Sequence, residues 1–136
     1  QQLWQLNHAL EKLSSRMEKR IGITAQQRLV LRCLGQYPGL TAGQLANLLH
    51  LDPGTVSATL NRLESKKLLK RRRDPQDKRR VFLGLTANGH VLERSARSTA
   101  ENAVTQLLKK AAQQDVSATM KVLAQLTNLL AQESGE

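Results

Sequence analysis

Residues 71–80, with the sequence RRRDPQDKRR, contain six of the 21 basic side chains of this 136-residue chain. The stretch from Arg62 to Arg80 holds ten Lys or Arg and three acidic residues, so it carries a net charge of +7 out of the total of +10. Like charges repel, so such a run is either a solvated tail or a contact surface for an anionic partner. A localised basic excess is typical of proteins that bind nucleic acid. An anionic membrane would require an amphipathic helix with large apolar side chains, and this stretch has none.

Other side chains that could do chemistry are scattered. His8, His50 and His90 each stand alone, without a His or Cys three or four residues away, so we expect no metal site. Asp74 and Asp77 are crowded by arginines and have no nucleophile or general base near them in the sequence. We therefore expect neither an enzyme nor a cofactor.

Cys33 is the only cysteine, so the chain can form no internal disulfide, which fits a reducing cytosol. It lies on the expected apolar side of the helix over 24–37, which carries Leu29, Val30, Cys33, Leu34 and Tyr37. Apolar neighbours raise the pKa of a thiol and make it less reactive. We therefore expect a small core residue rather than a redox sensor.

Composition places the chain among globular proteins of one domain, residues 1–136. Hydrophobic residues make up 40% of it and aromatic residues only 2%, which weighs against binding single strands by base stacking. It has no apolar run long enough for a membrane span or a signal peptide, so we expect a cytoplasmic protein.

Hydrophobic periodicity and capping residues predict six helices and one hairpin. The expected helices cover about 3–20, 24–37, 41–50, 52–66, 86–112 and a last segment capped by Asp115, and the expected strands cover 68–73 and 80–85. Gly89 is expected to weaken the first turn of the long fifth helix. Two short helices joined by a tight turn and followed by a basic hairpin describe a mainly α fold, the winged helix-turn-helix.

The helix over 52–66 has the pattern of a DNA-reading helix, which fits the major groove and reaches base edges. Val56, Leu60 and Leu63 recur on one side, and we expect them to face the core. We expect the opposite side, together with the start of the preceding helix, to bind DNA. These residues are Thr41, Thr55, Ser57, Ala58, Thr59, Asn61 and Arg62.

Residues 40–89 resemble the MarR family of winged helix-turn-helix transcriptional regulators. The most specific part is D-P-x-D-x-R, an alternating strand and L-T-x-x-G, which here run from Asp74 to Gly89. The resemblance implies that Arg79, at the wing tip, enters the minor groove. Asp74 and Asp77 would pair with neighbouring arginines and hold the loop in one shape. The residues expected to contact phosphates are Arg71, Arg72, Arg73, Lys78 and Arg80.

The chain departs from the family pattern just after the expected DNA-reading helix. The family usually has glycine in Glu-x-x-Gly-Leu, whereas Glu64-Ser65-Lys66-Lys67-Leu68 places Lys67 there. A left-handed cap costs lysine about 1 kcal/mol more than glycine. We therefore expect this helix end to be wound differently.

The resemblance also implies a homodimer built from residues 1–22 and 86–136, with residues 23–85 as the DNA-binding lobe. Such a dimer would read an inverted repeat in double-stranded DNA. The resemblance further implies a repressor that is released by a small aromatic or lipophilic effector, which would bind in a pocket between the dimer helices and the winged domain. His8, Arg16, Met17 and Tyr37 lie on the first two helices, but no motif assigns any of them to an effector. The alternative is an architectural protein that coats DNA without reading its sequence.

Overall fold

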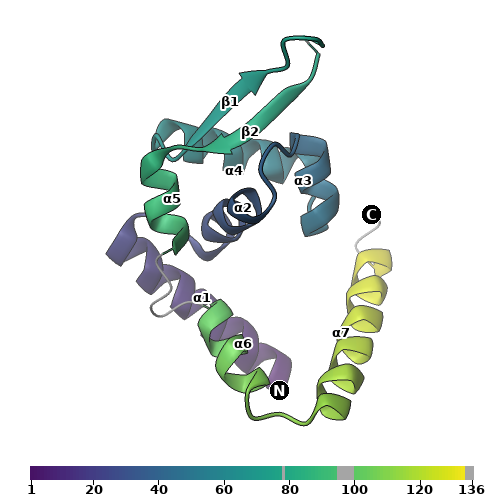
Figure 1. Ribbon diagram of the computed structural model, residues 1–136. Helices are drawn as coiled ribbons and strands as arrows, with labels where there is room; N and C mark the ends of the chain where they lie inside the picture. The colour runs from purple at the N-terminus through teal and green to yellow at the C-terminus, as the bar shows by residue number, and fades with distance from the viewer. Residues whose placement is uncertain (78, 95–99, 134–136) are drawn as a thin grey trace. The chain divides into compact units, whose positions relative to one another are not determined.

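The computed structural model describes residues 1–77, 79–94 and 100–133, which form seven helices and one two-stranded antiparallel sheet (Figure 1). The predicted mainly α, winged helix-turn-helix fold is confirmed. The helices are α1 (Gln2–Ile21), α2 (Ala25–Gln36), α3 (Ala42–Leu49), α4 (Pro53–Ser65), α5 (Ala87–Arg94), α6 (Ala100–Leu108) and α7 (Gln113–Glu133), and the strands are β1 (Leu69–Arg73) and β2 (Val81–Leu85).

The chain divides into two compact units, Gln1–Ala100 and Glu101–Glu136. The first unit contains one hydrophobic core, to which α2, α3, α4 and the hairpin all contribute. Its buried members are Ile23, Val30, Leu31, Leu34, Leu45, Ala46, Val56, Leu60, Leu63, Leu68, Leu69, Leu83 and Leu85. Burying a Leu or Val side chain stabilises a fold by about 1.5–3 kcal/mol, so this cluster fixes α4 and the hairpin on one scaffold.

Side-chain caps fix the starts of three helices. Thr24 and Thr41 each form a capping box at the start of α2 and α3, with a glutamine three residues later. Asp52 caps α4 by accepting the Thr55 N–H at 2.9 Å, and Pro53 is the first helical residue. The helix-turn-helix is therefore specified by local sequence at each helix start.

The hairpin is joined to the helices through its main chain. Its register pairs Leu69 with Leu85 and Arg73 with Val81, so the buried leucines lie at the end that packs on the core. The N–H of Leu83 also donates to the carbonyl of Leu40, before α3, at 2.8 Å. The loop lies at the far end of the hairpin (Figure 1). The wing is thus anchored at its base and exposed at its tip.

The end of α4 corrects the expectation of a different winding. Lys67 adopts the left-handed conformation, with φ of 56°, although it carries a Cβ. The Lys67 N–H donates to Glu64 O at 2.8 Å and the Leu68 N–H donates to Leu63 O at 3.0 Å. These two hydrogen bonds form a Schellman motif, which usually has glycine at the position of Lys67. Burial of Leu63 and Leu68 stabilises this conformation. The expectation was wrong because core packing outweighs the local preference of lysine.

Gly89 has a packing role at the start of α5. Thr86 caps this helix through a hydrogen bond from the Gly89 N–H at 3.1 Å, and its own N–H donates to the Leu68 carbonyl at 3.1 Å. A Cβ on Gly89 would lie 2.1 Å from that carbonyl oxygen. The L-T-x-x-G motif therefore lets α5 approach the segment between α4 and β1.

A buried arginine joins α2 to α5. Arg28 is only 2% exposed, and its guanidinium donates to the carbonyls of Leu92 at 2.5 Å and Glu93 at 3.2 Å. These carbonyls belong to the last turn of α5, where the helix dipole is negative. The Glu93 carboxylate pairs with Arg32 at 3.1 Å. A positive charge from α2 thus caps the C-terminal end of α5.

Two other expectations about α2 were incorrect. Leu29 and Tyr37 were predicted on its apolar side, but they are 42% and 47% exposed. The helix packs against α1, α4, α5 and β2, and its buried face is centred on Val30, Leu31 and Leu34.

The C-terminal helices differ from prediction in their boundaries. The helix expected over 86–112 corresponds to α5 and α6, and residues 95–99 between them lie outside the described part. Helix α6 ends at Leu108. Helix α7 begins at Gln113, so Asp115 lies in its first turn and is not its N-cap as predicted. A two-helix unit of this kind buries little by itself: Val104, Leu107 and Met120 are more than half exposed.

Candidate nucleic-acid interface

The outward face of α4 is formed by small and polar side chains. Four of the residues predicted on this face are exposed, namely Ser57, Ala58, Asn61 and Arg62. Thr55 is partly buried. Thr59 is only 4% exposed, so its predicted place on this face is wrong. It follows Val56 by three residues and precedes Leu63 by four, which places it on the buried stripe of the helix.

Thr41 and Asp52 are the N-cap residues of α3 and α4. The Thr41 hydroxyl accepts the Gln44 N–H at 3.3 Å, so the predicted DNA-binding Thr41 is engaged as a helix cap. Hydrogen bonds from the side chain and backbone of Thr55 lower the pKa of Asp52 below its usual range. Asp52 therefore stays ionised and continues to cap α4 well below neutral pH.

The wing loop is shaped by two aspartates. Asp74 accepts the Gln76 N–H at 2.8 Å, and Asp77 accepts the Arg79 N–H at 3.0 Å. Main-chain bonds close the loop, from Asp74 to the Arg80 carbonyl and from Arg80 to the Asp77 carbonyl, both at 2.9 Å. In the part of the loop that the structure describes, the carboxylates bind main-chain N–H groups and not the predicted arginine side chains.

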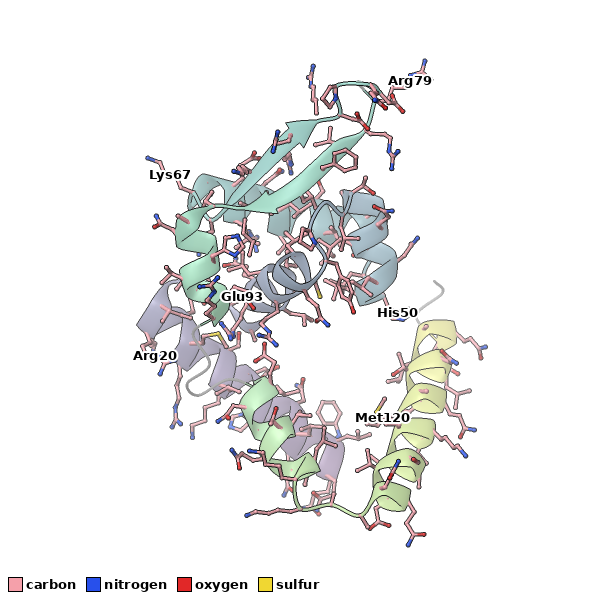
Figure 2. The ribbon with its side chains drawn as sticks, viewed as in Figure 1. Arg20, His50, Lys67, Arg79, Glu93 and Met120 are labelled. Carbon is pink, nitrogen blue, oxygen red and sulfur yellow. The ribbon has the colours of Figure 1, made fainter. Side chains whose placement is uncertain are left out.

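Arg79 is exposed at the tip of the wing (Figure 2). Its side chain projects from a loop whose backbone Asp77 fixes. Lys78, predicted to contact phosphate, lies outside the described residues. A guanidinium presented in this way can enter a narrow groove of negative potential.

The predicted phosphate-binding arginines of β1 and of the wing loop differ in their surroundings. Arg80 lies over the ring of Phe82, 5.3 Å from its centroid, in a cation–π contact. Arg71 pairs with Glu64 at 3.1 Å and donates to Asn61 Oδ1 at 2.8 Å. Arg72 and Arg73 are exposed on β1. Sequence reasoning missed Glu64, because a contact between α4 and a strand leaves no periodic signal.

The residues considered for an effector do not converge on one site in the described structure. Arg16 and Met17 line a shallow hollow of about 230 Å³ on α1, together with Leu13 and Arg20. His8 and Tyr37 are exposed and are not among its lining residues.

Cys33 is partly buried against the core, as a core residue would be. Burial raises the pKa of its thiol, partly offset by the charge of Arg32. Among the described residues, no cluster of His, Cys, Asp and Glu could hold a metal ion. No described helix combines the length and apolar character of a membrane span.

Comparison with known proteins agrees with this geometry. Residues 23–81 match the model of the MarR family. The organic hydroperoxide resistance transcriptional regulator of Bacillus subtilis is 35% identical over 77 residues, which cover 57% of this chain and 52% of that protein. The match thus spans about half the length of that relative.

Solved structures match nearly the whole chain, among them a DNA complex and a ligand complex. The Staphylococcus aureus MepR–DNA complex is 28% identical, with a TM-score of 0.77 and 94% of both chains covered. The Streptomyces coelicolor regulator PcaV, solved with its natural ligand, is 25% identical, with a TM-score of 0.70 and coverage of 90% of this chain and 89% of that chain. The Bacillus subtilis and Streptomyces coelicolor proteins are both named as transcriptional regulators. Over residues 23–81 the chain thus resembles the MarR family, and its fold is similar to that of the MepR and PcaV structures.

Proposed function

We propose that this chain is a transcriptional regulator that binds double-stranded DNA in a sequence-specific manner. The observation that carries the proposal is that α4 and the basic wing pack on the same hydrophobic core. The polar face of α4 and the arginines of the wing are thereby held in a fixed arrangement at the surface. A helix in the major groove can read bases, while Arg79 and the strand arginines contact the minor groove and the phosphates. The match to a MepR–DNA complex supports the same role.

The proposed DNA-binding set follows the described geometry. Ser57, Ala58, Asn61 and Arg62 face the bases and Thr55 flanks them. Thr41 and Asp52 set the helix starts. The wing contributes Arg72, Arg73, Arg79 and Arg80, with Asp74 and Asp77 holding its loop, while Lys78, outside the described residues, is proposed from the sequence alone.

We propose a homodimer formed by residues 1–22 and 86–136, with residues 23–85 as the DNA-binding lobe. Helix α1 exposes Leu3, Trp4, Leu6 and Leu10, each by 45% or more. Between α6 and α7 lies a hollow of about 430 Å³ with an almost wholly apolar lining that includes Leu107. Exposed apolar surface of this extent is typical of an interface. A two-fold dimer would read an inverted repeat.

The regulator is proposed to repress and to be released by a small aromatic or lipophilic effector. The relative PcaV was solved with a natural ligand, which supports a ligand-responsive regulator. The effector must bind more tightly to a dimer whose two reading helices no longer match the groove spacing. The rival proposal is a protein that coats DNA without reading its sequence.

Selection from a pool of random duplexes, followed by titration of the selected and a scrambled duplex at two salt concentrations, tests the proposal. We expect an enriched inverted repeat bound at least about a thousandfold more tightly than the scrambled duplex. Equal, salt-sensitive binding to both would contradict sequence-specific regulation and favour the coating protein.

A further inference from the structure

The side chain of Asn61, on the outward face of α4, is held by a residue of the wing. Arg71 of β1 donates to Asn61 Oδ1 at 2.8 Å. The Arg71 guanidinium is itself fixed by Glu64, one turn further along α4, at 3.1 Å. Strand β1 is anchored beside this helix because Leu69 is buried in the core. The three polar side chains therefore form one connected group on the surface.

The contact determines which end of the amide remains available. A guanidinium has only donors, so the amide atom that faces Arg71 must be the oxygen. The Asn61 nitrogen, with its two N–H donors, is left to bind another group. Asn61 follows Ala58 by three residues on the exposed stripe opposite Val56 and Leu60, so this nitrogen belongs to the face proposed to meet DNA.

A base that approaches Asn61 and Arg71 therefore faces hydrogen-bond donors from both side chains. Guanine presents two acceptors in the major groove, N7 and O6, whereas adenine presents one acceptor and one N–H₂ donor. An asparagine that reads adenine uses its oxygen to accept from that donor. In this protein a positive guanidinium is bound to the same oxygen, so a second set of donors is disfavoured there.

We propose that Arg71 is a positioning residue that makes Asn61 select guanine over adenine. This inference rests on the proposed function and specifies which base the α4 face reads. Arg71 then acts on recognition through Asn61, in contrast to a plain phosphate contact, which would not depend on sequence.

Selection from random duplexes with the full chain and three variants tests this. Wild type is expected to enrich guanine at one position of each half-site, and Asn61→Ala to lose that preference. Arg71→Met removes the donors but keeps the length of the side chain, so the amide can turn. We expect its preference at that position to shift from guanine to adenine, changing the ratio of the two by about tenfold or more.

Arg72→Met is the matched control. It removes the same charge from the next residue of β1, whose side chain points to the opposite face of the hairpin. We expect weaker binding to all sequences and an unchanged base preference. Thermal unfolding midpoints of both methionine variants close to that of wild type would show that their fold is intact.

The outcomes separate the inference from the proposed function. Retention of guanine by Arg71→Met would overturn the inference, as would an adenine preference in wild type. If Asn61→Ala changed no position while a sequence was still enriched, Asn61 would not read a base, and the regulator would stand without this inference. If wild type enriched no sequence, the proposed function itself would fail.

Discussion

The carbonyl oxygen of Leu68 occupies the space beside Gly89 that a side chain would need, because a Cβ there would lie only 2.1 Å from it. That carbonyl also accepts the N–H of Thr86 at 3.1 Å, so it cannot move away without losing a hydrogen bond. The first turn of α5 and the entry to the wing are therefore packed backbone to backbone.

Gly89→Ala should lower the free energy of unfolding by about 3 kcal/mol, since overpacking against backbone cannot be relieved by a side-chain rotation. Chemical denaturation would measure it. Gly43→Ala is the control, because Gly43 lies in α3 with no atom near its missing Cβ. Alanine is the better helix former, so this change should stabilise the protein by about 0.5–1 kcal/mol. Equal effects at both positions would refute the packing explanation.

Lys67→Gly should stabilise the protein by about 0.5–1 kcal/mol. Glycine adopts the left-handed conformation seen at this position without strain, although its greater freedom in the unfolded chain offsets part of the gain. Denaturant midpoints would show the difference. Lys67→Ala keeps the Cβ and removes only the rest of the side chain, so it should bring no such gain. A similar stabilisation by alanine would mean that the lysine charge, and not its backbone conformation, is unfavourable.

Arg79→Ala should weaken binding to an operator and to random DNA alike, because a wing-tip arginine in the minor groove makes mostly electrostatic contact. The slope of log affinity against log salt concentration should become shallower by about one for each protomer. Titrations over a range of salt concentrations would measure the slope. Lys121→Ala, which removes a charge from α7, should leave it unchanged. An unaltered slope for Arg79→Ala would exclude this role.

Cys33 should react slowly with alkylating reagents at neutral pH. Burial raises the pKa of its thiol, so the reactive thiolate is scarcer than in an ordinary cysteine, and its share grows only as the pH rises through that higher pKa. The alkylation rate should therefore still be increasing at pH values where a free thiol has levelled off. The denatured chain provides the comparison. Fast alkylation of the folded protein near pH 7 would instead favour a redox sensor.

Much of the fold was predictable because its signals are local. The caps at Thr24 and Asp52, the proline after Asp52 and the alternating pattern of β2 depend on residues only a few positions apart. Each identifies an element start or a buried face without knowledge of the rest of the chain. These signals placed α2, α4 and the hairpin close to their observed bounds.

The features that sequence reasoning missed depend on distant contacts. Arg28 is buried because it meets carbonyls 64 and 65 residues away, and no periodicity of α2 indicates this. Arg71 was expected on phosphate, but it contacts Asn61 across the turn between helix and strand. Thr59 is a polar residue on a buried stripe, where polarity alone predicts exposure. In all three cases the tertiary surroundings outweigh residue type.

The hydrogen bonds of the buried Arg28 guanidinium couple α2 to α5, so that the two helices move together. Separating the two helices would leave a buried positive charge without its carbonyl partners. The free-energy cost of such an unpaired buried charge is far larger than that of sliding two apolar surfaces past each other. Helix α2 also packs against α4 and β2, so a displacement of α5 would carry with it the elements that support α4 and the wing. Helices α2 and α5 would thus move as one rigid body and would not separate by local loosening.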